Sequence, residues 1–304
     1  MTTRSGAAWV SVLSNTALIV LKLFAAIVTG SIALLTEAFQ SIIDLLASTI
    51  ALLSIRRAEQ PPDEDHTYGH EKAENLAAAF EGVLILGGAG LIIYEAAGRL
   101  ADPPELESLG VGIVVIAVTI VINLVVSAFL SRRARQFGSP ALEGDAAHLF
   151  TDALSSIGVL VGLVAVAITD EVVFDAIAAI LVALAIIYTG VRIVARSGRV
   201  LVDEAPPPEE LDRIEAAIAA AAIPEMIGYH KLRARRAGRR RWMDLHVQFR
   251  DGTSLERAHE AAHQLRDVIR AQVPDADVLI HVEPESSVRE MGDSPLRWGE
   301  SRNG

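Results

Sequence analysis

Four polar residues lie inside two strongly apolar stretches of the sequence, in two pairs with the same spacing. Gln40 and Asp44 stand four residues apart in one stretch, and His148 and Asp152 repeat that spacing in another. Residues four apart share one face of an α-helix, so two helices could each offer two ligands to one ion. The four groups would form a roughly tetrahedral site for a divalent metal. The alternative is that they only make hydrogen bonds between helices or cap them.

A second set of possible ligands lies in a short polar segment. Asp63, His66 and His70 follow at intervals of three and four residues, with Gly69 available to turn the chain. One carboxylate and two imidazoles suit a transition-metal ion. The segment is equally compatible with three solvated side chains that bind nothing.

A third set lies near the C-terminus, where polar and apolar residues alternate as they do in half-buried strands. Within 242–249, His246 faces away from the core that its apolar neighbours would form, and His281 and Glu283 share a face of a later strand. His230 begins an earlier strand. We expect these four residues to converge on one exposed sheet surface. The alternative is an ordinary solvated face.

Six apolar runs must position the first set. Each is long enough to cross a bilayer, which takes about 20 helical residues, and hydrophobic residues make up 51% of the 304 residues. Asp44 lies near the middle of the second run, at an insertion cost of roughly 2.5–3.5 kcal/mol, and such carboxylates mark ion pathways. The predicted spans are 9–28, 32–55, 76–98, 110–130, 146–168 and 172–195.

Positive charge is concentrated in the segments after the second, fourth and sixth runs, whereas the segments 99–108 and 169–171 hold almost none. The positive-inside rule therefore predicts that both termini lie in the cytoplasm.

A small α+β domain follows Pro206–Pro208. The pattern predicts helices over 209–222 and 254–272, and strands over 228–235, 241–250 and 276–283. This α-β-β-α-β order is typical of a ferredoxin-like sandwich. We therefore expect a six-helix transmembrane domain over 1–205, a cytoplasmic α+β domain over 206–284, to which the resemblance described below adds metal binding and dimerisation, and a disordered polar tail over 285–304.

The composition excludes several classes of function. A net charge of -11 argues against nucleic-acid binding, which favours basic surfaces. Because the chain has 0 cysteines, it has no disulfide framework and no thiolate ligand or nucleophile. Any metal site must use imidazole, carboxylate and amide groups.

Taken together, these features resemble the cation diffusion facilitator family. The resemblance rests on TGSIALLTEAFQSIIDLLAS, PPDEDHTYGHEKAENLAA, GDAAHLFTDALSS, LVDEAPP, DLHVQF and VLIHVEP, and it runs from about residue 9 to 284. It implies a homodimeric six-helix transporter of the inner membrane, with a cytoplasmic ferredoxin-like domain, that exchanges a divalent metal for protons. The chain resembles the bacterial zinc and ferrous-iron efflux branch in particular, so the resemblance implies export of Zn²⁺, with Fe²⁺, Mn²⁺, Co²⁺ or Cd²⁺ as other candidate ions.

The resemblance also assigns roles to single residues. It places the transport site on Gln40, Asp44, His148 and Asp152, and a loop site on Asp63, His66 and His70; it places a cytoplasmic binuclear site on His230, His246, His281 and Glu283, with His259 as a bridging neighbour, and a charged interlock at the dimer centre on Lys72 and Asp203.

The chain departs from the family at Gln40, where relatives usually carry His or Asp. An amide oxygen is neutral and neither binds nor releases a proton. It also weakens the expectation of strict zinc preference, because oxygen-rich sites accept Mn²⁺, Fe²⁺ or Co²⁺ more readily. Glu37 could supply an oxygen instead of Gln40. Glu283 stands where Asp is more common.

Two other functions remain open on the sequence. Residues 259–263 read HEAAH, the zinc-protease pattern in which two histidines hold the metal and Glu260 activates water. A domain of this size leaves little room for a substrate cleft, and the motif leaves Asp44, His148 and Asp152 unexplained. The other function is a metal-sensing membrane scaffold that binds ions without transporting them.

Overall fold

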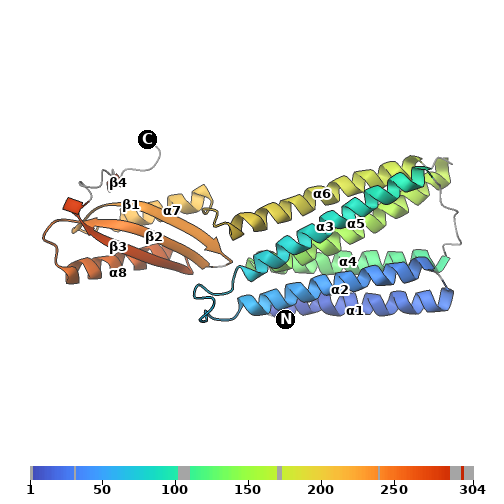
Figure 1. Cartoon of the computed structure of the whole chain (residues 1–304), viewed down its shortest axis with the longest axis horizontal. Helices are drawn as coiled ribbons and strands as arrows, with labels where there is room; N and C mark the ends of the chain where they lie inside the picture. Colours follow the sequence, from blue (N-terminus) through green and yellow to red (C-terminus); the bar gives the residue numbers. More distant parts are fainter. Residues whose placement is uncertain are drawn as a thin grey trace. The chain divides into compact units, whose positions relative to one another are not determined.

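The computed structural model describes residues 3–30, 32–101, 110–169, 173–238, 240–287 and 296–297. The chain divides into two compact units, Met1–Leu201 and Val202–Gly304. Figure 1 shows that the first unit is a bundle of long helices and that the second combines helices with a small sheet. The expected external loops fall largely in 102–109 and 170–172, which lie outside the described residues.

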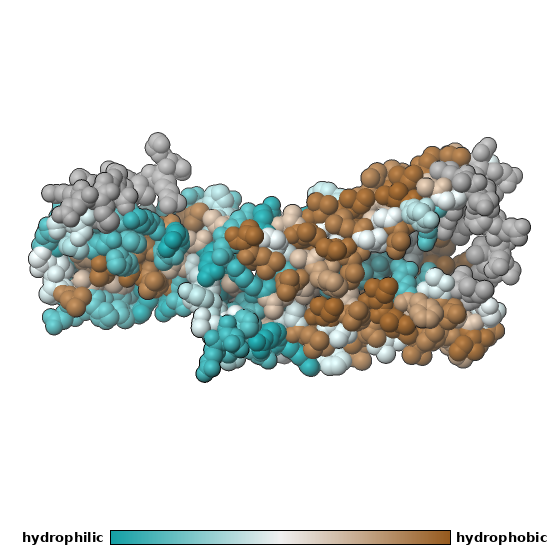
Figure 2. Space-filling model, viewed as in Figure 1, coloured by the Kyte–Doolittle hydropathy of each residue, from teal (hydrophilic) through white to brown (hydrophobic). Residues whose placement is uncertain are grey.

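Six helices form the first unit: α1 (Arg4–Thr29), α2 (Ile32–Ala58), α3 (Ala73–Ala101), α4 (Gly110–Phe137), α5 (Pro140–Thr169) and α6 (Val173–Leu201). All six are long and apolar enough to cross a membrane, which confirms the predicted six-helix fold. Many large apolar side chains on these helices are exposed, including Phe24, Ile27 and Tyr94. Figure 2 shows apolar residues gathered over this unit, as expected for a surface that faces lipid.

Helix α5 begins six residues before the predicted start of its apolar run. Pro140 is its first residue, and the Ser139 side chain accepts a hydrogen bond from the backbone N–H of Leu142 at 3.3 Å. A proline in the first turn and a serine just before it are common at helix starts. The consequence is that Asp145, which the hydropathy pattern leaves just outside the run, belongs to the helix and is buried.

Helices α3 and α6 approach each other closely through two glycines (Figure 1). A Cβ atom on Gly82 would lie 3.2 Å from the Gly190 carbonyl oxygen, and a Cβ on Gly190 would lie 3.1 Å from the Gly82 carbonyl oxygen. Helix α1 packs along α2, and α4 packs along α5. Helix α5 also contacts α2, α3 and α6, so it links the two sides of the bundle.

The second unit contains α7 (Pro208–Ala220), β1 (Met226–Ala237), β2 (Arg240–Phe249), α8 (Leu255–Gln272), β3 (Ala276–Pro284) and β4 (Leu296–Arg297). The sheet order is β3-β2-β1-β4, with β1 antiparallel to β2 and β2 parallel to β3. The predicted α-β-β-α-β order is therefore confirmed. Its core joins apolar residues of both helices to those of the sheet, among them Ile214, Leu245 and Leu265.

The polar tail differs in part from the predicted disorder. Residues 285–287 continue from β3 as a helical turn, and Leu296–Arg297 pair with Gly228 and Tyr229 of β1. An unpaired strand edge offers backbone groups to any extended segment, which accounts for β4. The remaining tail residues lie outside the described part of the chain.

A buried ion pair holds the start of α7. Glu210 is 5% exposed and accepts a hydrogen bond from Nε of Arg241 at 3.0 Å and another from Arg236. Burial disfavours the charged carboxylate, but the two guanidinium groups outweigh it and hold the pKa of Glu210 below its ordinary value of 4.5. A carboxylate with a lowered pKa stabilises the fold above its ordinary pKa, and this contribution is lost as the pH falls.

We therefore predict that Glu210→Gln loosens the contact between α7 and the β1–β2 hairpin. The local free energy of opening should fall by about 1–3 kcal/mol, the value of a hydrogen bond to a charged group. Hydrogen–deuterium exchange on the full chain at neutral pH measures this change. The wild type should loosen progressively as the pH falls from about 4.5 through the lowered pKa of Glu210. Glu209→Gln, in the same turn, is the control. Equal exchange in the two variants would contradict the prediction.

Candidate metal sites

Helices α2 and α5 bring three of the predicted ligands together inside the bundle. Nε2 of His148 lies 3.2 Å from Oδ1 of Asp44 and 3.8 Å from Oδ2 of Asp152. One possible ligand atom from each residue lies within 4.8 Å of the others, so the three could hold one ion. His148 is buried, and the two carboxylates are partly exposed. Residues more than one hundred positions apart thus form a compact donor set of two carboxyl groups and one imidazole.

Polar residues behind this site connect its helices. Asn15, 1% exposed, donates from Nδ2 to the backbone oxygen of Asp44 at 3.3 Å and to Oγ of Ser48 at 2.8 Å. Ser48 donates in turn to Oδ1 of Asp145 at 2.9 Å. Amide and hydroxyl groups commonly join membrane helices in this way, and here they fix the backbone that carries Asp44.

Gln40 and Glu37 differ in surroundings from the three central residues. Gln40 is exposed, and no hydrogen bond joins it to Asp44, His148 or Asp152 within the described chain. Oε2 of Glu37 lies 2.9 Å from Nζ of Lys22, a buried lysine that also donates to Ser41 at 2.9 Å. Glu37 is therefore already neutralised by Lys22, which disfavours it as the substitute ligand for Gln40.

The loop between α2 and α3 brings Asp63, His66 and His70 together. Oδ1 of Asp63 accepts from the backbone N–H of His66 at 2.7 Å, and Oδ2 lies 3.1 Å from Nε2 of His70. The two imidazole rings are 4.6 Å apart. Gly69 turns the chain at φ 89°, a conformation that favours glycine. The three residues could hold one ion, with His70 buried and the other two exposed.

The Asp63 carboxylate is kept in its charged, metal-binding form. Desolvation acts against the charge, but the hydrogen bonds from the His66 backbone and ring, together with nearby His70, hold the pKa of Asp63 below its ordinary value. A ligand must be deprotonated before it binds a metal, so Asp63 remains available at mildly acidic pH.

The sheet of the second unit aligns three histidines across three strands. His230 of β1 is the register partner of His246 in β2, and His246 is the partner of His281 in β3. The ring centroids are 5.1 Å and 4.6 Å apart along this row. Glu283 lies two residues beyond His281 on the same face, which is the arrangement that the alternating pattern predicts.

Glu283 is the centre of this group. Its Oε1 lies 2.6 Å from Nδ1 of His246 and 3.4 Å from Nε2 of His281, and its Oε2 lies 3.1 Å from Nε2 of His230. His230, His246 and Glu283 could hold one ion. The prediction of an exposed surface is wrong for two members, because His230 and Glu283 are buried and only His281 is largely exposed. The site is a partly buried cluster in which His281 is the most exposed member.

Helix α8 carries His259 and His263 on its exposed face. Their rings are 4.3 Å apart, and Glu260 between them pairs with Arg257 at 2.7 Å. The residues of α8 that face the core are Ala258, Ala261, Leu265 and Ile269. The catalytic glutamate of a zinc protease must be free to activate water, whereas this glutamate is paired with arginine and Glu283 is committed to the sheet histidines. The geometry does not support a protease.

Lys72 and Asp203 each contact a group of their own unit. Nζ of Lys72 donates to the carbonyl oxygen of Leu201 at 3.3 Å, and Asp203 accepts from Arg235 at 3.0 Å and 3.1 Å. Their predicted mutual contact at a dimer centre stays a prediction.

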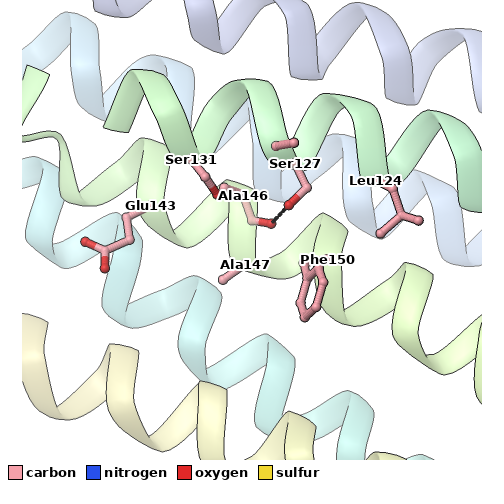
Figure 3. A pocket seen from close by; sticks show the side chains of 8 residues that line it. Leu124, Ser127, Ser131, Glu143, Ala146, Ala147 and Phe150 are labelled. Carbon is pink, nitrogen blue, oxygen red and sulfur yellow. Dashed lines mark hydrogen bonds between the residues drawn. The ribbon is translucent and has the colours of Figure 1, made fainter. Parts of the chain in front are cut away.

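A shallow cavity of about 400 Å³ lies between α4 and α5, and none of the predicted ligands is among its lining residues. Figure 3 shows its lining, with Ser127 donating to the carbonyl oxygen of Ala146 at 2.6 Å. Because this hydroxyl is satisfied by the backbone and the rest of the lining is mainly apolar, the cavity offers a metal little besides Glu143, which is paired with Arg196.

Residues 8–202 match the cation efflux transmembrane domain, and residues 206–285 match the cytoplasmic domain of cation efflux proteins. The chain belongs to the cation efflux family. It is 34% identical over 272 residues to the cation-efflux pump FieF of Klebsiella pneumoniae, covering 90% of each chain. It is 35% identical over 288 residues to FieF of Yersinia pestis, covering 93% of this chain and 95% of the relative.

Two solved structures are similar to the C-terminal domain of this cation efflux protein. CzrB in its zinc form is 36% identical, with a TM-score of 0.27, and the match covers 28% of this chain and 94% of that one. The metal-bound C-terminal domain of the CzcD transporter from Thermotoga maritima is 29% identical, with a TM-score of 0.24, and the match covers 26% and 94%.

Family membership confirms the resemblance to cation diffusion facilitators and makes the chain a multi-pass cation efflux transporter instead of a conventional enzyme. Sequence reasoning missed the buried carboxylates Glu81 and Asp145 of this cation efflux protein. The sequence did offer a signal for Asp145, because it lies seven residues before Asp152 and therefore on the same helix face as the predicted ligands. It was overlooked because the predicted apolar run begins at the next residue.

We predict that His230→Ala and Glu283→Ala each weaken zinc binding to the C-terminal domain by at least about tenfold. Each change removes a buried donor that contacts the others directly. Isothermal titration of the full-length protein with Zn²⁺ measures the effect. His263→Ala, which removes an exposed histidine of the same domain, is the control and should leave this binding event intact. Unchanged zinc affinity in both cluster variants would refute the site.

Proposed function

We propose that this protein exports a divalent transition-metal ion from the cytoplasm in exchange for protons, with Zn²⁺ preferred. The observation that supports this function best is the group formed by Asp44, His148 and Asp152, in which two membrane helices supply two carboxylates and one imidazole within 4.8 Å. Two carboxylates balance the charge of a divalent cation, and the nitrogen ligand favours zinc and neighbouring transition metals over Mg²⁺ or Ca²⁺.

Exchange follows from competition between the metal and protons for the same atoms. A metal binds only deprotonated carboxylates and a neutral imidazole, so its entry releases protons and protonation expels it. In this scheme the ion enters from the cytoplasm, the site opens to the outside, and the more acidic exterior protonates the ligands. The metal ion and the protons therefore occupy the same ligand atoms, one after the other.

The placement of the ligands on two helices suits such a transition. Asp44 is on α2, which packs with α1, whereas His148 and Asp152 are on α5, which contacts α3 and α6. A small rigid displacement between these groups of helices changes the distance from Asp44 to His148, and with it the affinity for the ion. Rocking of helix groups around a fixed site is the general mode of alternating access.

We further propose that the protein is a homodimer in the inner membrane with both termini in the cytoplasm. Ions held by His230, His246, His281 and Glu283 would draw two C-terminal domains together, with His259 as a bridging neighbour. Lys72 and Asp203 would interlock at the dimer centre. The group of Asp63, His66 and His70 would hold a further ion. The similarity to the family's cytoplasmic domain supports this assignment.

With Gln40, the transport site should have a broader metal preference than it would have with Asp or His at this position. An amide oxygen at this position would complete the site through an oxygen donor. We therefore include Fe²⁺, Mn²⁺, Co²⁺ and Cd²⁺ among the ions that the protein exports.

Asp44→Ala is predicted to abolish metal uptake into inside-out vesicles and the accompanying proton flux. The change removes one of two charged ligands, so the loss should be at least about a hundredfold, the effect of removing a buried charge partner of roughly 3 kcal/mol. Asp63→Ala, which removes a carboxylate from the loop group, is the control and should retain transport. Wild-type rates in the Asp44 variant would contradict the assignment, and metal binding by the wild type without any flux would indicate a sensing scaffold.

Gln40→Asp and Gln40→His should shift the order of metal preference towards Zn²⁺ and Cd²⁺. Each replaces a neutral oxygen donor by a ligand that transition metals bind more strongly. A competition series with Zn²⁺, Fe²⁺, Mn²⁺, Co²⁺ and Cd²⁺ in reconstituted vesicles measures the order. An unchanged order in both variants would mean that Gln40 does not contact the ion.

A further inference from the structure

Two carboxylic side chains are completely buried in the bundle and belong to none of the three metal sites. Glu81 of α3 and Asp145 of α5 are each 0% exposed. Both oxygens of Glu81 and Oδ2 of Asp145 lack a hydrogen-bond partner among the described residues. An ionised carboxylate without a partner in an apolar interior costs several kcal/mol. We therefore expect a proton or a cation to neutralise these carboxylates.

The two side chains are brought together by the backbone of α5. A side chain on Gly144 would overlap the Glu81 carboxylate, so the glycine makes room for Glu81 against α5 at the residue before Asp145. The negative charge of Asp145 acts on Glu81 within this buried region. Oδ1 of Asp145 is held by the hydroxyls of Ser11 at 3.0 Å and Ser48 at 2.9 Å, which leaves Oδ2 as its free atom.

Glu74 shows how the same bundle surrounds another buried carboxyl group with partners. Glu74 is also buried, at 2% exposed, but Arg4 lies 2.7 Å away and Ser139 donates to its other oxygen. Glu81, two turns further along the same helix, has neither an arginine nor a hydroxyl. The contrast indicates that Glu81 is neutral at rest, with its charge cancelled by a proton.

We propose that Glu81 and Asp145 bind one proton between them and form a second protonation site, distinct from the metal ligands. This inference rests on the proposed metal/proton exchange. When the metal binds at the transport site, the O–H bond of the pair breaks, its electrons stay on the carboxylate, and the proton leaves to water on the cytoplasmic side. The pair regains a proton when the metal leaves.

The position of the pair couples it to the transport site. Asp145 precedes His148 by one helical turn, and the charged groups that act on it include His148 of α5, Asp44 of α2 and Glu81 of α3. The groups that reach it from α1 and α2 are the uncharged Ser11 and Ser48, and Ser48 connects through Asn15 to the backbone of Asp44. A divalent ion one turn away lowers the cost of a negative charge on the pair, so metal entry favours release of its proton.

The experiment counts the protons released when Zn²⁺ binds to the full-length protein in lipid nanodiscs. Isothermal titration in buffers of different ionisation enthalpy gives this number. Glu81→Gln and Asp145→Asn keep the shape of the side chains but remove the exchangeable proton, and each should release about one proton fewer per Zn²⁺ bound at the transport site. Glu143→Gln, an exposed carboxyl beside Gly144, is the matched control and should release as many protons as the wild type.

Infrared difference spectroscopy supplies a second, direct measurement. Zinc addition to the wild type should remove the carbonyl band of a protonated carboxylic acid, and Glu81→Gln should lack that change while Glu143→Gln keeps it. Wild-type proton release in both pair variants, or no carboxylic-acid band in the wild type, would overturn the second protonation site. Absence of any proton release from the wild type would instead overturn the proposed exchange itself.

Discussion

Every charge inside the helical bundle needs a partner, because the apolar interior cannot solvate it. The structure meets this constraint with permanent partners at some places and with removable ones at others. Arg4 neutralises Glu74, and Lys22 pairs with Glu37. Between Asp44 and Asp152 the partner is His148, whose charge depends on a proton. A pair with arginine keeps its positive partner at every physiological pH, whereas the proposed exchange uses a pair whose positive partner comes and goes with a proton.

The C-terminal domain satisfies the same constraint with a sheet. Glu283 is buried, and its two oxygens are shared by His230 and His246, which face each other across adjacent strands. Strand register fixes these positions within one folded domain, so the site keeps its shape as long as the domain does. The membrane site joins α2 and α5, which belong to different sides of the bundle, so its shape depends on the relative position of these two helices.

Local periodicity explains how much of this could be predicted from the sequence. The four-residue spacing of His148 and Asp152, and the alternation around His246, place side chains on one face whatever surrounds them. Burial is a property of the packing between distant segments, so the sequence could not show that Glu283 is buried or that Gln40 is exposed. Asp145 was missed for a related reason, since Ser139 and Pro140 start its helix before the apolar run begins.

The contact between Gly82 and Gly190 has a mechanical consequence. Because neither glycine has a side chain, the backbones of α3 and α6 come close together, with Val194 and Leu86 packed against the two glycines. Helix α6 runs directly into the C-terminal domain at Val202, and Gly82 is the residue after Glu81. We therefore expect α3 and α6 to move as one body. Because Glu81 directly precedes Gly82, its buried carboxyl group lies one residue from the tightest contact of this helix pair.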